Sequence, residues 1–201
     1  MKKKDIKNYF QAIRQNDLAR VIELVSTNME YLNACNFAPP KKDDGQSGLQ
    51  VAFKTGNFEI AKFLIEQNID VNFIELSEIN EWKAPVLHDC IRATIFNSIK
   101  FQKDTMRFHI AFELLKEMLR RKSNPNAIDS YGNNCLNRAL MDARQALDGT
   151  DIFENGVLIE QLRSVFKELI SFGADSKEKN DKRESLEHNI LNFRMEKYKL
   201  I

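Results

Sequence analysis

The stretch Asp44–Asn72 reads DGQSGLQVAFKTGNFEIAKFLIEQNIDVN, and its pattern is that of two short helices joined by a tight turn. Gly45 allows a turn that other residues resist, and Ser47 is suited to cap the helix that follows. Gly56 interrupts the helical pattern, and Asn68 suits a helix end in a left-handed conformation. In both halves the apolar residues recur at helical spacing, at Leu49, Ala52, Phe53, Ile60, Ala61, Leu64 and Ile65. The stretch therefore predicts a helix–turn–helix unit with one apolar side.

This unit resembles the ankyrin repeat, whose pattern is roughly G-x-T-P-L-H-x-A, then a glycine, then a leucine-rich helix that ends in G-A-D-x-N. The matching positions are Gly45, Ser47, Leu49, Ala52, Gly56, Leu64, Asp70 and Asn72. The sequence departs from the pattern at Gly48, Gln50 and Asn68, where the family has proline, histidine and glycine. The resemblance implies a solenoid of stacked helical hairpins that binds other proteins.

Two further copies of the pattern follow the compact unit. One opens at Pro85-Val86-Leu87-His88 and closes as LLKEMLRRKSNPN at Asn126. The other opens at Asp129 as DSYGNNCLNRAL and closes as VFKELISFGADSK, with Gly173-Ala174-Asp175 at the family's ending. In both copies the opening and closing halves lie farther apart than in the compact unit. We expect the extra residues to lengthen the first helix of each copy, over Ile91–Ile99 and Ala139–Leu147.

Both ends of the chain suit the caps that a solenoid needs, because a terminal repeat has only one neighbour to cover its apolar face. The first copy has apolar residues in the register of the compact unit, Asn16 in place of its glycine, and Lys7, Arg14 and Arg20 on a polar outer face. Near the other end, Ser185 precedes a helix with Leu186, Ile190 and Phe193 on one side.

We therefore predict an all-α fold, with one ankyrin-repeat domain over residues 1–201. It comprises about four helix–turn–helix repeats, over residues 1–33, 43–72, 83–126 and 129–177, and a capping helix over 181–200. The helices of the third and fourth repeats are lengthened. An unrelated helical bundle has equally amphipathic helices. A bundle does not explain why the same turns recur at Gly45 and Gly132, or why the same endings recur after the second helices.

Composition argues against several functional classes. The 30 basic and 29 acidic residues leave a formal charge of +1, which does not favour nucleic-acid binding. The basic start has no apolar stretch behind it, so we expect no membrane anchor. The odd number of widely spaced cysteines favours reduced thiols in the cytoplasm. Cysteine and histidine spacing offers no metal site, and the acidic stretch Asp148–Gly156 lacks the pattern of a calcium loop. We expect no cofactor and no metal.

The connections between repeats are the best candidates for a functional surface. The family binds partners with its hairpin tips and the adjoining inner helices, which form a concave face. The two connections before Leu49 and before Leu87 are longer than usual, and the second carries Trp82, the sole tryptophan. Large aromatic side chains dominate binding hot spots. The alternative is that Trp82 packs under its own loop. The candidate partner-binding residues are Phe37, Phe73, Ile74, Leu76, Trp82, Arg92, Tyr131 and Arg138.

We therefore expect a protein-binding module that inhibits, sequesters or scaffolds a partner protein. The alternative is an enzyme with a site on the lengthened helices, where Arg92, Arg138, Asp142 and Arg144 supply charge. No nucleophile–base spacing, phosphate loop or metal signature accompanies these residues, so we expect neither catalysis nor a small-molecule substrate. His88 stands at the family's histidine position, which implies a structural role. Cys90 lies two residues from His88 on the same helix, so the two side chains point apart and do not form a catalytic pair.

Overall fold

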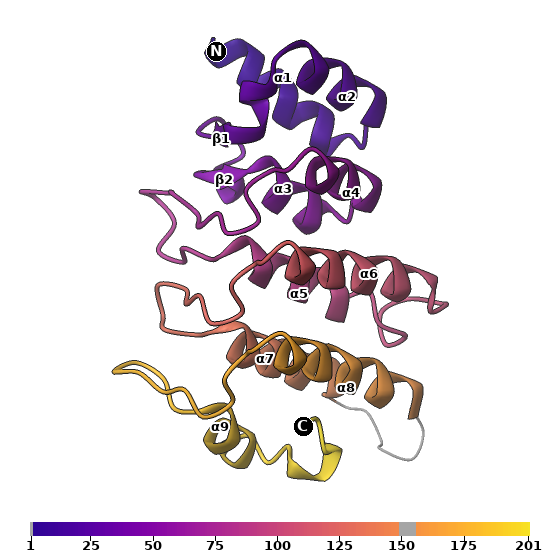
Figure 1. Ribbon diagram of the computed structural model, residues 1–201, viewed down its shortest axis with the longest axis vertical. Helices are drawn as coiled ribbons and strands as arrows, with labels where there is room; N and C mark the ends of the chain where they lie inside the picture. Colours follow the sequence, from indigo (N-terminus) through magenta and orange to yellow (C-terminus); the bar gives the residue numbers. More distant parts are fainter. Residues whose placement is uncertain (1, 149–155) are drawn as a thin grey trace. The chain divides into compact units, whose positions relative to one another are not determined.

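The computed structural model describes residues 2–148 and 156–201 (Figure 1). Within these ranges the protein is mostly α-helical, as predicted. The only strands in the described ranges are β1 (Cys35–Asn36) and β2 (Gln46–Ser47), which pair antiparallel with Cys35 opposite Ser47. The chain divides into two compact units, one up to Asp89 and one from Cys90 onward, and each is described by itself.

The first unit consists of two helical hairpins and the loops that follow them. Its helices are α1 (Lys3–Arg14), α2 (Leu18–Thr27), η1 (Met29–Asn33), η2 (Lys41–Asp43), α3 (Gly48–Thr55) and α4 (Phe58–Glu66). Helix α1 packs on α3, and α2 packs on α4, so the two hairpins lie in successive layers. Helix α5 (Val86–Ile95) begins in this unit and ends in the second.

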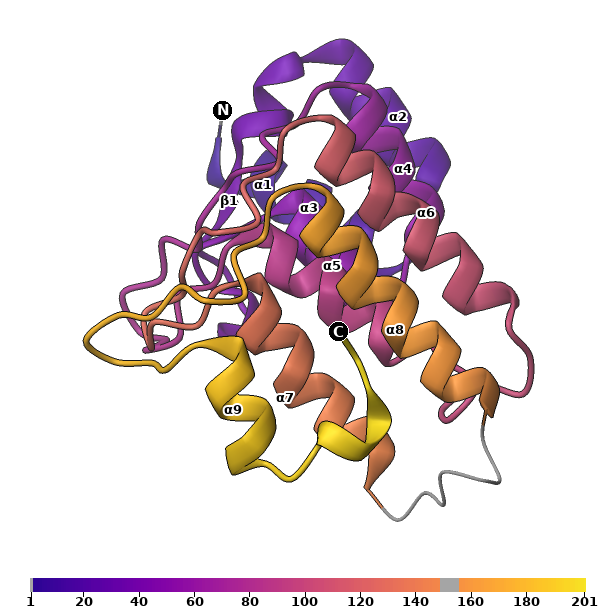
Figure 2. The same cartoon turned by 60° about the horizontal axis from the view of Figure 1, so that its bottom comes forward.

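The second unit repeats the hairpin arrangement with longer helices. After α5 its elements are α6 (Met106–Arg120), α7 (Cys135–Leu147), α8 (Gly156–Ser171), α9 (Leu186–Asn192) and η3 (Glu196–Tyr198). Helix α7 packs against both α8 and α9, and α6 lies beside α8 (Figure 2). The predicted capping helix is therefore present as α9, although it is shorter than the predicted span 181–200 because it ends at Asn192 and only a 3-10 turn follows.

Ser47 and Ser185, which the sequence places before helices, both cap them, and Asn134 provides a cap that was not predicted. The Ser47 side chain accepts the Gln50 N–H, and the Gln50 side chain accepts the Ser47 N–H in return, which forms a capping box. Ser185 caps α9 by accepting the His188 N–H. Asn134 caps α7 in the same way, two residues after Gly132, just as Ser47 follows Gly45.

The second helix of three successive hairpins ends in the same turn. Asn68, Lys122 and Gly173 follow α4, α6 and α8 with φ of 62°, 65° and 92°. In each turn this residue and the next donate their backbone N–H groups to carbonyls of the last helical turn. A further shared feature comes two residues after the left-handed position, where the side chains of Asp70, Asn124 and Asp175 each accept a backbone N–H two residues on. The helix endings that recur in the sequence therefore share one backbone geometry.

One predicted helix extension is confirmed and the other is wrong. Helix α7 continues to Leu147 as expected, whereas α5 ends at Ile95 and not near Ile99. Beyond Ile95 the Asn97 side chain bonds the Ala93 carbonyl, and polar side chains of this kind compete with the helix backbone. The Ile99 N–H is accepted by Gln161 of α8. Much of the extra length lies instead in α6, which has 15 residues against 9 in α4.

Burial follows the predicted apolar positions closely. The seven residues predicted to form the apolar side of the compact unit, namely Leu49, Ala52, Phe53, Ile60, Ala61, Leu64 and Ile65, are all buried. One polar assignment needs correction, because Arg14 does not lie on an outer solvent face. Its Nε lies 2.7 Å from the buried Asp43 carboxylate, so the guanidinium holds the loop before α3. No helix of the described ranges has the length and apolar character that crossing a membrane requires.

Candidate protein-binding surface

Two long loops of the first unit form the candidate surface. We refer to residues 34–47 as the first finger and to residues 73–85 as the second finger; they extend to the same side of α3 (Figure 1). The first finger is closed by the β1–β2 pair and by the bond from the Gly45 N–H to the Asn36 carbonyl. The second is closed by backbone bonds from Glu75 to Ala84 and from Val86 to Phe73.

The two fingers are bonded to each other. The Leu76 N–H donates to the Gly45 carbonyl at 2.9 Å, and the Ser77 hydroxyl donates to the Asp44 carboxylate at 2.8 Å. A Cβ atom on Gly45 would lie only 2.0 Å from the Ser77 nitrogen, and the φ of Gly45 is +71°. Glycine is therefore required here both for the left-handed backbone and for the close approach of the second finger.

A buried polar cluster lies beneath the fingers. Gln46 donates to the Glu75 carboxylate at 3.2 Å, and Gln50 donates to the Asp89 carboxylate at 2.9 Å. The Lys54 ammonium lies 3.9 Å from both carboxylates. Burial raises the pKa of Glu75, while Lys54 and the hydrogen bonds from Asn80 and Gln46 oppose that rise. The cluster therefore joins both fingers to α3 through hydrogen bonds and the Lys54 ammonium.

Four apolar side chains of the two fingers are exposed to solvent. Phe37 is 65% exposed in the first finger, and Ile74, Leu76 and Ile79 are 44%, 54% and 58% exposed in the second. The partner-binding candidates Phe37, Ile74 and Leu76 therefore reach solvent. Ile79 was not among the predicted site residues, although an apolar residue in a polar loop was the signal that could have identified it.

Trp82 and Phe73 are half-buried and protrude less than these four side chains. The Lys54 ammonium lies 5.8 Å from the centroid of the Trp82 ring, a cation–π distance. Trp82 is therefore neither a fully exposed binding anchor nor a fully buried residue under its own loop, the two alternatives that the sequence left open. The side chain that contacts it, Lys54, was not predicted to have a role.

The remaining predicted residues, Arg92, Tyr131 and Arg138, belong to the second unit. Arg92 is exposed and lies over the Phe96 ring at 5.3 Å, and Tyr131 is exposed in the loop before α7. Arg138 forms a two-pronged pair with Asp142, with nitrogen–oxygen distances of 2.7 and 3.0 Å. Burial raises the pKa of Asp142, and Arg138 and Arg92 oppose that rise.

The other chemically interesting residues are buried. His88, Cys90 and Cys135 have almost no exposed surface, and burial raises the pKa of the Cys135 thiol. In residues 2–148 and 156–201, no group of three or more His, Cys, Asp or Glu side chains is arranged to hold a metal ion. Most of the acidic stretch Asp148–Gly156 lies outside the described residues.

Comparison with known proteins adds no assignment to this surface. No protein-family model matches the chain, and no curated protein is significantly similar to it.

Proposed function

We propose that this chain is an ankyrin-type repeat protein that binds a partner protein through its fingers and the adjoining helices. The observation that carries the proposal is the exposure of Phe37, Ile74, Leu76 and Ile79 on two loops that are bonded to each other and to a buried polar cluster. Continuous exposed apolar surface marks interaction sites, and these four side chains lie on adjoining loops.

The repeat assignment is supported by the recurrence of local geometry. The capped starts at Ser47 and Asn134 follow a left-handed glycine at the same spacing. The endings at Asn68, Lys122 and Gly173 share one turn. Repeats of this kind bury their apolar faces against their neighbours and leave one long side for partners.

This surface suits a protein that acts by binding its partner and not by catalysing a reaction. Loops already fixed in the free protein lose little conformational entropy when they bind, so more of the contact energy appears as affinity. The charged pair Arg138–Asp142 is already formed within α7, so we assign the main contacts to the first unit and keep Arg92, Tyr131 and Arg138 as secondary candidates. Inhibition, sequestration and scaffolding are the outcomes that such binding produces, and we expect them in the cytoplasm.

The proposal is tested with a matched pair of substitutions. Ile79→Asp places a charge on the second finger, and Ile22→Asp places the same charge at an exposed position of α2 in the same unit. Immobilised wild-type protein and both variants are incubated with extract from the native source, and bound proteins are quantified by mass spectrometry. We expect a partner that the wild type and Ile22→Asp capture equally and that Ile79→Asp captures at least about tenfold less.

Two results would contradict the proposal. One is capture of the same proteins to the same extent by all three chains. The other is loss of capture with Ile22→Asp but not with Ile79→Asp, which would place the interface on the outer helices. Circular dichroism of each variant checks that the helices are retained.

A further inference from the structure

A groove between α6 and α8 of the second unit lies outside the surface described above. Its volume is about 720 Å³, within the range of small-molecule sites. The aromatic part of its wall is formed by Phe108 and Phe112, whose rings stack with centroids 5.6 Å apart. Val157 of α8 lies at the rim and is 54% exposed.

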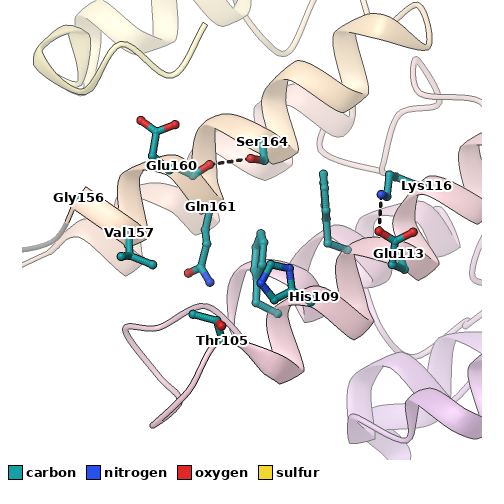
Figure 3. A pocket seen from close by; sticks show the side chains of 11 residues that line it. Thr105, His109, Glu113, Lys116, Gly156, Val157, Glu160, Gln161 and Ser164 are labelled. Atoms are coloured by element: carbon teal, nitrogen blue, oxygen red, sulfur yellow. Dashed lines mark hydrogen bonds and ion pairs between the residues drawn. The ribbon is translucent and has the colours of Figure 1, made fainter.

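Gln161 brings an unsatisfied donor to this groove. The side chain extends from α8 toward α6, with Thr105 and His109 on the facing segment (Figure 3). Its Oε1 accepts the Ile99 N–H at 2.9 Å, which fixes the amide so that the NH₂ group is the free end. Gln161 is only 6% exposed, and within the described ranges Nε2 has no acceptor. A buried donor without a partner is costly, so the site favours a ligand that supplies an acceptor.

The charges that line the groove select among acceptors. The carboxylates of the lining are Glu113 and Glu160, and its ammonium is Lys116. Glu113 is paired with Lys116, and Glu160 is paired with Arg163 at 2.6 Å. Both carboxylates are therefore neutralised, and Lys116 is occupied by Glu113, so the groove lining offers an anion no unpaired cation. An ammonium ligand has no acceptor to offer Gln161.

We propose that this groove binds a small neutral carbonyl compound, such as an amide or ester, with an apolar ring. The carbonyl oxygen accepts a hydrogen bond from Gln161 Nε2, and the ring lies against Phe108 and Phe112. Because Nε2 has almost no exposed surface, rim side chains must rotate when the ligand binds, a change that is common at binding sites. The site lies in the second unit and is independent of the proposed partner-binding surface.

The test is a titration of the full-length, ¹⁵N-labelled chain followed by NMR. Three probes share a phenyl ring on a short chain: N-methylphenylacetamide is neutral, phenylacetate is anionic, and phenethylammonium is cationic. The Gln161 side-chain NH₂ signals are assigned by their disappearance in Gln161→Leu. We expect the neutral amide to shift these signals and to bind at least about tenfold more tightly than either charged probe.

Two variants separate binding from folding. Val157→Arg places a long charged side chain at the rim, and Ile170→Arg makes the same change at an exposed position of α8 that does not line the groove. We expect Val157→Arg to weaken amide binding at least about tenfold and Ile170→Arg to leave it unchanged. Unmoved Gln161 NH₂ signals, equal binding of the three probes, or equal binding by the two arginine variants would each overturn the proposal.

Discussion

Replacing Gly45 with alanine tests whether the two fingers depend on each other. The new methyl group would lie 2.0 Å from the nitrogen and 2.5 Å from the Cα of Ser77, so the second finger must move away. The left-handed backbone at φ +71° costs a non-glycine residue about 1–2 kcal/mol. Separating the fingers also loses the bonds from Leu76 to Gly45 and from Ser77 to Asp44, at about 1 kcal/mol each. The expected loss of unfolding free energy is therefore about 3–4 kcal/mol.

Gly173 offers a matched control for this substitution. Its φ is +92°, and apart from Gly173 and its chain neighbours no atom of the described residues lies within 4 Å of a Cβ built there. Gly173→Ala should therefore cost only the backbone strain, about 1–2 kcal/mol. Urea unfolding is followed for both variants by circular dichroism, and for Gly45→Ala also by the fluorescence of Trp82, the sole tryptophan. If Gly45→Ala costs no more than Gly173→Ala, the contact between the fingers does not contribute as argued.

Three further substitutions test single interactions by urea unfolding. Ser47→Ala removes the capping box of α3 and should cost about 1 kcal/mol, whereas Ser47→Asp should retain most of the stability. Arg138→Leu leaves the buried Asp142 carboxylate unpaired and should cost about 3 kcal/mol, and a double Arg138→Leu, Asp142→Leu variant that is not more stable would contradict this. Burial raises the pKa of Glu75 above 4.5, so the folded state holds this proton more tightly, and the stability it adds below pH 4.5 is lost as the pH rises through the folded pKa. Glu75→Gln cannot titrate and should therefore lose less stability than the wild type between pH 4.5 and neutrality; parallel pH curves would refute the assignment.

Local backbone chemistry was the part of the fold that could be predicted from the sequence. Glycine and asparagine at helix ends, and serine before a helix, act through groups only a few residues away. Gly45, Ser47 and Asn68 therefore adopt the predicted conformations. The left-handed Lys122 was not predicted, because nothing in the chemistry of lysine favours that conformation.

The end of α5 shows where local pattern is insufficient. Ile91, Ile95 and Ile99 have helical spacing, yet the helix ends after Ile95. The Ile99 N–H is satisfied by Gln161, which is 62 residues away along the chain. The local sequence pattern contains no information on such a distant partner. A prediction from periodicity alone therefore placed the end of the helix too late.

The candidate surface could likewise be predicted only where its features depend on residues close together in the sequence. The length and apolar content of the second finger were visible in the sequence, but the direction of each side chain was not. Trp82 lies beside Lys54 because Lys54 is held between Glu75 and Asp89, two carboxylates from distant positions. Ile79 is left exposed by the same arrangement, since the Ile79 N–H donates to the Ser77 hydroxyl and Ser77 is bonded to the first finger.

The buried polar cluster gives a physical reason why the proposed binding surface can be built on irregular loops. An apolar cluster beneath the fingers would bury more surface favourably, but apolar contacts are non-directional and tolerate several loop positions. The hydrogen bonds that Gln46 donates to Glu75 and that Gln50 donates to the Ala84 carbonyl have defined directions, so they restrict the positions that the fingers can take. The raised pKa of Glu75 shows that this choice has a cost in desolvation. Under the proposed function this cost is offset on binding, because exposed side chains that are already held in position lose less conformational entropy when a partner binds.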